Sequence, residues 1–107
     1  MTNMPEKRRR VVWAPRAKQD LHRVWRHYAR VASPELADDM LREIAQTGEH
    51  LANRALMWRA RDEVAPGLRS VLSHPYVIFY RLKPDGVEIA RVLHERRNFS
   101  EVFKKER

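Results

Sequence analysis

The sequence predicts an α+β fold in which a helical hairpin packs on an antiparallel sheet. Apolar residues recur at three- and four-residue spacing between residues 15 and 51, which is typical of amphipathic helices. Runs rich in β-branched and aromatic residues follow between residues 68 and 94, with Pro and Gly turns between them. With 107 residues, of which 43% are hydrophobic, the chain suits a single domain spanning 1–107.

The composition limits the class of protein. The net charge is +8, with basic residues concentrated at both ends, which favours encounter with acidic partners, either nucleic acid or an acidic protein segment. The absence of cysteine excludes a disulfide scaffold and a cysteine-based zinc site or nucleophile. No apolar stretch approaches the roughly 20 residues of a membrane span, and the apolar run after Arg10 is too short for a signal peptide. We therefore expect a cytoplasmic protein.

The N-terminal half is expected to form a short strand and the first helix. Residues 1–9 are expected to be a flexible basic segment, and residues 10–13 a strand. Pro15 suits the first position of a helix, because its missing N–H has no partner there. The apolar face of this helix consists of Ala17, Leu21, Val24, Tyr28 and Ala32, with Trp25 beside it.

A second helix is predicted directly after the first. Ser33 and Pro34 are typical of an N-cap and a first helical position, and so short a connection makes the two helices antiparallel. Its apolar face consists of Leu36, Met40, Leu41, Ile44, Ala45, Gly48 and Leu51. Neither helix can bury its apolar face on the other alone, so a sheet must complete the core.

The C-terminal half is expected to form that sheet. After an irregular link over 53–60, Pro66-Gly67, His74-Pro75 and Lys83-Pro84-Asp85-Gly86 mark turns or breaks. The predicted strands cover 68–73, 76–82 and 87–94, and the second is apolar on both faces, as in a central strand. Residues 98–107 are expected to be a short C-terminal helix or tail.

Four motifs stand in a fixed order in this half: Arg61-Asp62-Glu63, Pro66-Gly67-Leu68-Arg69, Ile78-Phe79-Tyr80-Arg81 and Arg91-Val92-Leu93-His94, with Arg96-Arg97 behind them. Together with Pro15-x-Ala17 and Asp20-Leu21, they resemble the ParE side of the ParE/RelE superfamily of bacterial toxins over about residues 9–100. The resemblance implies the RelE/ParE fold: an N-terminal strand, an antiparallel two-helix hairpin, a three-stranded antiparallel meander in one sheet, and a short C-terminal helix.

The resemblance also implies a function. Such a protein would be the toxin of a type II toxin–antitoxin system, associated with plasmid stabilisation, that inhibits DNA gyrase by direct contact rather than by catalysis. A ParD-like antitoxin would neutralise it by wrapping a C-terminal segment around it. The ribbon-helix-helix N-terminus of that antitoxin would bind operator DNA, so the toxin would contact DNA only through its partner. No cofactor and no metal are expected.

The alternative is the RelE type, a ribosome-dependent endoribonuclease that cuts messenger RNA. Metal-independent cleavage needs a base and cations. The segment Ser100-Glu101-Val102-Phe103 echoes the tail of some ribonucleases, with Phe in place of Tyr, and Phe cannot transfer a proton. If the protein were nevertheless a ribonuclease, its catalytic candidates would be Arg69, Arg81, Arg91, His94 and Arg97. A third possibility is a non-toxic homologue that only binds an antitoxin.

Two groups of contact residues are expected. Candidates for contact with the target are Arg69, Arg81, Arg91, His94, Arg96, Arg97 and Phe99, although a histidine in the position of His94 more often only hydrogen-bonds neighbouring backbone. Candidates for contact with the antitoxin, as an acidic segment with Leu or Phe lying across the first helix and the sheet, are Leu21, Val24, Trp25, Tyr28, Val77 and Phe79. His22 and His27 are five residues apart, which does not favour a metal site.

Overall fold

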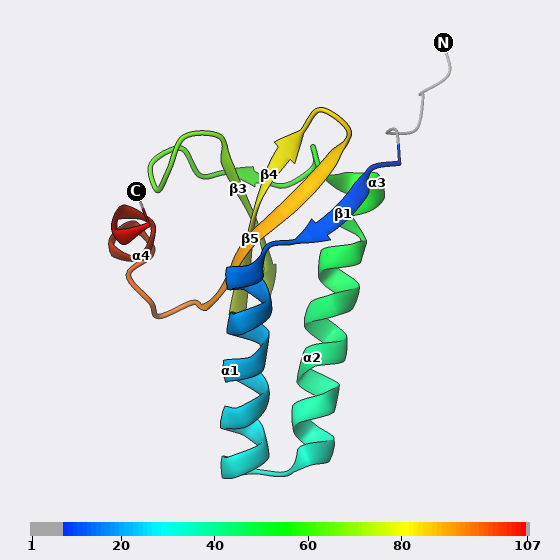
Figure 1. The fold of residues 1–107 in the computed structure, drawn as a ribbon, viewed down its shortest axis with the longest axis vertical. Coiled ribbons are helices and arrows are strands. Elements are labelled where there is room, and N and C mark those ends of the chain that lie inside the picture. Colours follow the sequence, from blue (N-terminus) through cyan, green and yellow to red (C-terminus); the bar gives the residue numbers. More distant parts are fainter. Residues whose placement is uncertain (1–7, 107) are drawn as a thin grey trace.

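The structure is a computed structural model that describes residues 8–106; residues 1–7, most of the predicted basic N-terminal segment, and residue 107 lie outside the described residues. The elements follow the chain as β1 (Arg10–Trp13), α1 (Pro15–Val31), α2 (Pro34–Glu49), α3 (Leu51–Arg54), β2 (Arg59–Ala60), β3 (Leu68–Ser73), β4 (Tyr76–Lys83), β5 (Gly86–His94) and α4 (Phe99–Lys105). The strands form one sheet in the order β1-β5-β4-β3-β2 (Figure 1). β1 is parallel to β5, and the other neighbours are antiparallel. The predicted α+β fold class is confirmed.

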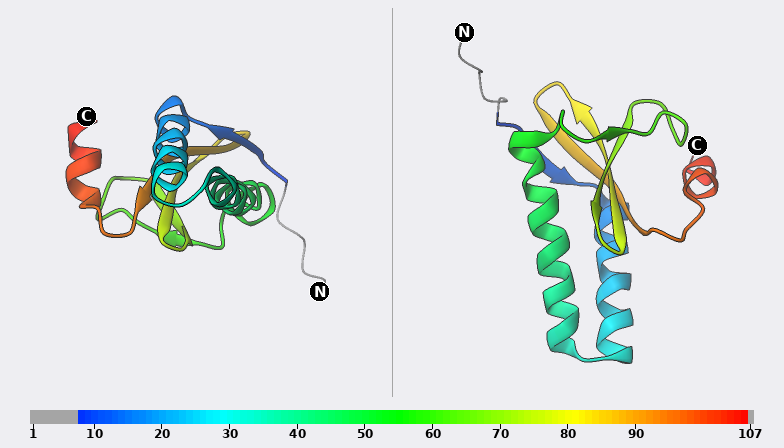
Figure 2. Two further views of the ribbon diagram at one scale, coloured as in Figure 1. Left: turned by 90° about the horizontal axis from the view of Figure 1, so that it is seen from below. Right: turned by 180° about the vertical axis from the view of Figure 1, so that it is seen from behind.

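The helical hairpin begins and turns where the sequence predicts. Pro15 opens α1, and the Ser33 hydroxyl caps α2 by accepting a hydrogen bond from the Leu36 N–H at 3.1 Å. The hairpin extends beyond the sheet at its α1–α2 turn (Figures 1 and 2). Leu36 belongs to the apolar face of α2, but it lies near that turn and is 41% exposed. The spacing of apolar residues shows a face, but it does not show how far the sheet reaches beneath it.

The sheet is covered on both faces, which explains why β4 is apolar on both of its faces as far as Arg81. On one face, Tyr76, Ile78 and Tyr80 join the core formed with α1 and α2. On the other face, Val77 and Phe79 join a second core to which α4 contributes Val102 and Phe103. The predicted short C-terminal helix is therefore part of the packed structure (Figure 2).

Two close approaches dock β1 on the rest of the domain. A Cβ atom on Gly86 would lie 2.4 Å from the backbone oxygen of Arg10, so the parallel pairing of β1 with β5 requires glycine there. A Cβ atom on Gly48 would lie 2.6 Å from the ring of Trp13. The Trp13 indole N–H also donates to Glu49 at 2.9 Å. β1 is thus held by backbone contact on one side and by α2 on the other.

The link predicted to be irregular contains two short elements, α3 and β2. β2 pairs with Arg69 and Ser70 of β3, and the Tyr80 hydroxyl donates to the Ala55 carbonyl at 2.7 Å. A two-residue strand is too short to show the alternation on which strand prediction relies. Across residues 8–106, none of the helices has the length and apolar character of a membrane span.

Candidate functional site

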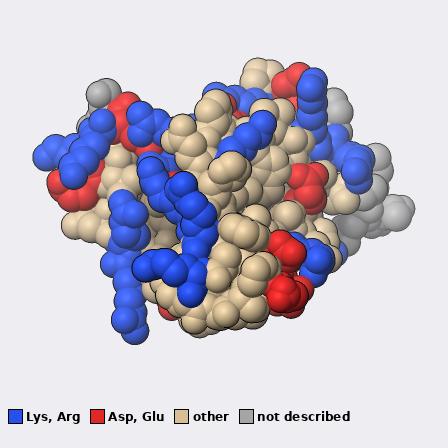
Figure 3. Space-filling view, turned by 60° about the horizontal axis from the view of Figure 1, so that its bottom comes forward, with Lys and Arg blue, Asp and Glu red and all other residues tan. Residues whose placement is uncertain are grey.

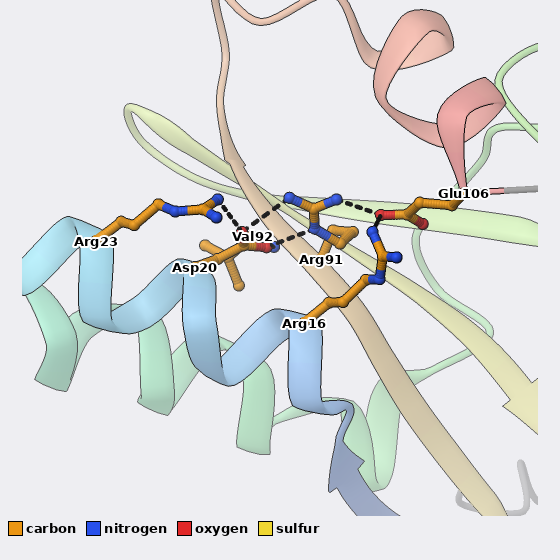
Figure 4. A network of polar contacts seen from close by, with 6 residues as sticks. All are labelled: Arg16, Asp20, Arg23, Arg91, Val92 and Glu106. Atoms are coloured by element: carbon orange, nitrogen blue, oxygen red, sulfur yellow. Dashed lines mark hydrogen bonds and ion pairs between the residues drawn. The ribbon is translucent and has the colours of Figure 1, made fainter.

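A buried carboxylate from α1 lies at the edge of β5 (Figure 4). Asp20 is 4% exposed, and its side chain accepts hydrogen bonds from Arg91 Nε at 2.8 Å, Arg91 Nη2 at 2.9 Å and the Val92 N–H at 2.9 Å. β1 accompanies β5 only as far as Ile89, so the edge beyond that residue is open. At this open edge, Asp20 accepts the hydrogen bond from the Val92 N–H that a further strand would otherwise accept.

Arg91 connects this carboxylate to the C-terminal helix. Its Nη1 donates to Glu106 just after α4, and Arg16 reaches the same carboxylate at 3.4 Å (Figure 4). The hydrogen bond to Asp20 raises the pKa of Arg91 above its usual value, although burial opposes the shift. Arg91 is 6% exposed, so its assignment as a free target-contacting cation was wrong. The residue instead joins α1, β5 and α4.

The face of the sheet beneath α4 is filled with aromatic rings. Phe79 is fully buried, with the rings of Phe99 and Phe103 edge-on to it at 4.8 and 5.2 Å between centroids. The Arg61 guanidinium lies 5.6 Å from the centroid of the Phe79 ring and 5.5 Å from that of Phe99. Phe79 and the buried Val77 were expected to touch the antitoxin. Because α4 closes over this face, both belong to the core of the free protein.

Two further target candidates make contacts within the protein. Arg69 donates from Nη1 to the backbone oxygens of Leu56 and Trp58, at 3.3 and 2.9 Å, and so ties the link before β2 to β3. The Arg81 guanidinium lies 6.0 Å from the centroid of the Phe103 ring. Both side chains are half-buried, and their contacts explain their positions without a partner.

The end of β5 presents the remaining target candidates. Nδ1 of His94 accepts a hydrogen bond from the Arg96 N–H at 3.1 Å, which is the local contact foreseen for this ring, and the ring lies edge-on to Tyr76 at 5.5 Å. Arg96 and Arg97 are exposed, and Phe99, the first residue of α4, is half-buried against the sheet. This end therefore carries two cations on the surface.

The expected antitoxin face of α1 is only partly open. Val24 is buried in the core, while Leu21 and Tyr28 are partly buried against it. Trp25 is half-buried, and its indole N–H donates to Asp38 of α2 at 2.9 Å. Trp25 is therefore the largest partly exposed aromatic side chain among the α1 candidates.

The two helices differ in charge. Figure 3 shows basic side chains gathered over α1 and acidic side chains over α2 on the face that comes forward from the bottom of Figure 1. The exposed cations of α1 are Arg16, Lys18, Arg23, Arg26 and Arg30. An acidic partner would therefore meet α1 more favourably than α2.

The sequence did not point to Asp20, Arg61 or Glu106 as members of these clusters. Asp20 had a recognisable signal, because it stands three residues after Ala17 and four before Val24, within the buried face of α1. No local pattern marks Glu106, whose partner Arg91 lies 15 residues earlier on another element. Among residues 8–106, no three His, Cys, Asp or Glu side chains are grouped as a metal site would require.

The sequence is similar to those of known bacterial toxins. Residues 11–99 match the family described as the ParE toxin of the type II toxin–antitoxin system parDE. Toxin ParE1 of Caulobacter vibrioides is 36% identical over 83 residues, covering 78% of this chain and 85% of that protein. Toxin RelE3 of the same organism is 35% identical over 81 residues, covering 75% and 87%.

A solved structure has the same fold. The chromosomal ParDE toxin–antitoxin system from P. aeruginosa contains a chain that superposes with a TM-score of 0.73 at 25% identity. The match covers 80% of this chain and 95% of the other. The hairpin and the sheet, apart from Arg10 at the start of β1, lie within the matched family region. The chain belongs to the ParE family, the toxins of type II toxin–antitoxin systems.

Proposed function

We propose that this toxin acts by binding DNA gyrase and blocking it through protein contact, without catalysing a reaction of its own, and that a ParD-like antitoxin neutralises it. The membership of the ParE family supports a toxin paired with an antitoxin. The exposed cations Arg96 and Arg97, next to His94 at the end of β5, form the surface that we assign to the target.

The chemistry beneath α4 is the observation that favours contact over RNA cleavage. Arg61 and Arg81 could stabilise negative charge at a phosphate. The aromatic side chains beside them, however, are Phe79, Phe99 and Phe103, and phenylalanine cannot act as a general acid or base. The guanidinium groups instead pack against these rings in cation–π contacts.

The charge and shape of α1 support the antitoxin partner. The helix carries exposed cations on one side and the half-buried Trp25 at the edge of its apolar face. Large aromatic side chains commonly anchor interfaces. An acidic segment with apolar anchors would match both features.

A supercoiling assay tests the target. Purified gyrase with relaxed plasmid and ATP should lose supercoiling activity and accumulate linear DNA when the toxin is added, and the antitoxin should restore activity. Arg96→Gln should weaken the inhibition, whereas Arg26→Gln, which removes one exposed charge from α1, should not.

A parallel assay follows messenger RNA on translating ribosomes. Unchanged supercoiling together with codon-positioned cleavage would instead establish a RelE-type ribonuclease, and inactivity in both assays would leave an antitoxin-binding protein.

A further inference from the structure

A small pocket lies between α1 and the end of β5. Its volume is about 140 Å³, and it lies beside the buried Asp20–Arg91 pair. It is lined by Asp20, Arg23, Val24 and His27 from α1, and by Tyr76, Val92, Leu93, His94 and Arg97 from the sheet and the segment after it. Its floor is apolar and its remaining walls are mainly basic.

The pocket lies against the open edge of β5. The Glu95 N–H donates to Pro75 across the β4–β5 ladder, so by alternation the backbone groups of Val92 and His94 point away from β4, toward the open edge. The Val92 N–H on this edge already donates to Asp20. The His94 N–H is the next one along the same edge, and His94 lines the pocket.

The cations around the pocket are not fully neutralised. Arg23 lies 3.6 Å from Asp20, but that carboxylate is already occupied by Arg91 and the Val92 N–H. The Arg97 guanidinium forms no ion pair with any of the residues that the structure describes, 8–106. Two imidazole rings, His27 and His94, complete the rim. The pocket therefore has donors for one more anionic group.

We propose that this pocket binds a carboxylate, supplied by an acidic side chain of a partner segment that lies in extended form along the open edge of β5. An extended segment suits the edge, because it can pair with the His94 N–H and the Val92 carbonyl; the His94 carbonyl already accepts a hydrogen bond from the Arg97 N–H. The apolar floor formed by Val24, Leu93 and the Tyr76 ring accommodates the stem of an acidic side chain or an apolar neighbour. Basic side chains on α1 also lie outside the pocket, where they would attract further acidic residues of the same segment (Figure 3). The proposal rests on the antitoxin interaction proposed above and deepens it. The pocket shares His94 and Arg97 with the surface assigned to the target, so a bound antitoxin would cover part of that surface, and the binding test itself does not involve gyrase.

The experiment uses the full-length toxin and a blocked acidic peptide of alternating Leu and Glu. Its affinity is measured by calorimetry, and the site is located by NMR, from the shifts of the His94 amide and of the His27 and His94 rings. A peptide with Gln in place of every Glu isolates the contribution of the carboxylate, and inorganic phosphate tests the other common anion.

We expect the Glu peptide to bind with shifts centred on these groups, and the Gln peptide to bind at least about tenfold more weakly, the effect of one charged hydrogen bond. Replacing Arg23 and Arg97 together by Gln should lower the affinity for the Glu peptide by a similar factor. Replacing Arg54 and Arg59 by Gln removes the same charge from exposed positions outside both α1 and the pocket, and should leave affinity nearly unchanged. A thermal melt of each variant checks its fold.

Three results would overturn the proposal. Equal binding of the Glu and Gln peptides would show that no carboxylate is recognised. Equal losses in the two double variants would show that general attraction, rather than this pocket, holds the peptide. Shifts at His94 with phosphate but not with the Glu peptide would assign the pocket to phosphate. None of these outcomes depends on whether gyrase is inhibited.

Discussion

Asp20 and Arg91, 71 residues apart in the chain, form a buried bidentate ion pair with nitrogen–oxygen distances of 2.8 and 2.9 Å. The pair joins the first helix to the last strand at the place where the sheet edge becomes open. Glu106 and Arg16 extend it toward α4. The same few residues thus connect the hairpin, the sheet and the C-terminal helix (Figure 4).

Replacing Asp20 by Asn should strongly destabilise the fold. The variant leaves the Arg91 guanidinium buried beside a neutral amide, and removing one member of a buried ion pair costs about 3–5 kcal/mol. Because Glu106 still faces Arg91, we expect about 3 kcal/mol of unfolding free energy to be lost, at the lower end of that range. Urea unfolding followed by circular dichroism measures it. Asp39→Asn, which breaks the exposed pair with Arg42, should cost less than about 1 kcal/mol; equal losses would contradict the role assigned to Asp20.

Replacing Glu106 by Gln should loosen α4 before it affects the rest of the domain. Glu106 is bonded to Arg91 and Arg16, and it links the end of this short helix to β5 and α1. The backbone amides of Val102 and Phe103 should exchange with solvent about tenfold faster, whereas those of β4 should change little. Glu101→Gln is the matched control, because its carboxylate is exposed. Uniform acceleration in both helix and strand would indicate global destabilisation instead.

Replacing Trp25 by Ala should weaken the complex with the antitoxin. Trp25 is the largest aromatic side chain on the basic helix and is partly exposed. Truncating an interface anchor typically costs about 2 kcal/mol, or about thirtyfold in Kd. The free toxin should keep its fold, because the lost hydrogen bond joins Trp25 to Asp38 near the surface. Calorimetry with the purified antitoxin measures the effect. Trp58→Ala removes another partly exposed tryptophan, and a comparable loss there would refute the choice of α1 as the antitoxin surface.

Replacing Gly86 by Ala should separate β1 from β5. The new methyl group would meet the Arg10 backbone oxygen, which a side-chain rotation cannot move. We expect the unfolding free energy to fall by about 1–3 kcal/mol, as in other overpacked sites. Asp85→Ala, in the same turn but exposed, should be close to neutral. A thermal melt compares the two, and equal stability would show that β1 shifts without cost.

Much of the fold follows from local patterns in the sequence. Pro15, Ser33 and the Lys83–Gly86 turn mark boundaries through their own backbone chemistry, so the hairpin and the three long strands could be placed without a structure. The two-residue strand β2 escaped prediction, because pairing with Arg69 and Ser70 rather than any pattern of its own makes it a strand.

The candidate site depended far more on tertiary structure. Strand patterns and turn chemistry act over a few residues, so Phe79 and Arg91 could be assigned to strands of a ParE-like sheet without a structure. The cover of α4 over Phe79 and the ion pair of Asp20 with Arg91 are visible only in the folded protein. Burial and ion pairing depend on which distant segment arrives at a face, and here the partners are separated by 24 residues in one case and 71 in the other. For that reason residues that read as surface contacts in the sequence are part of the interior of the folded toxin.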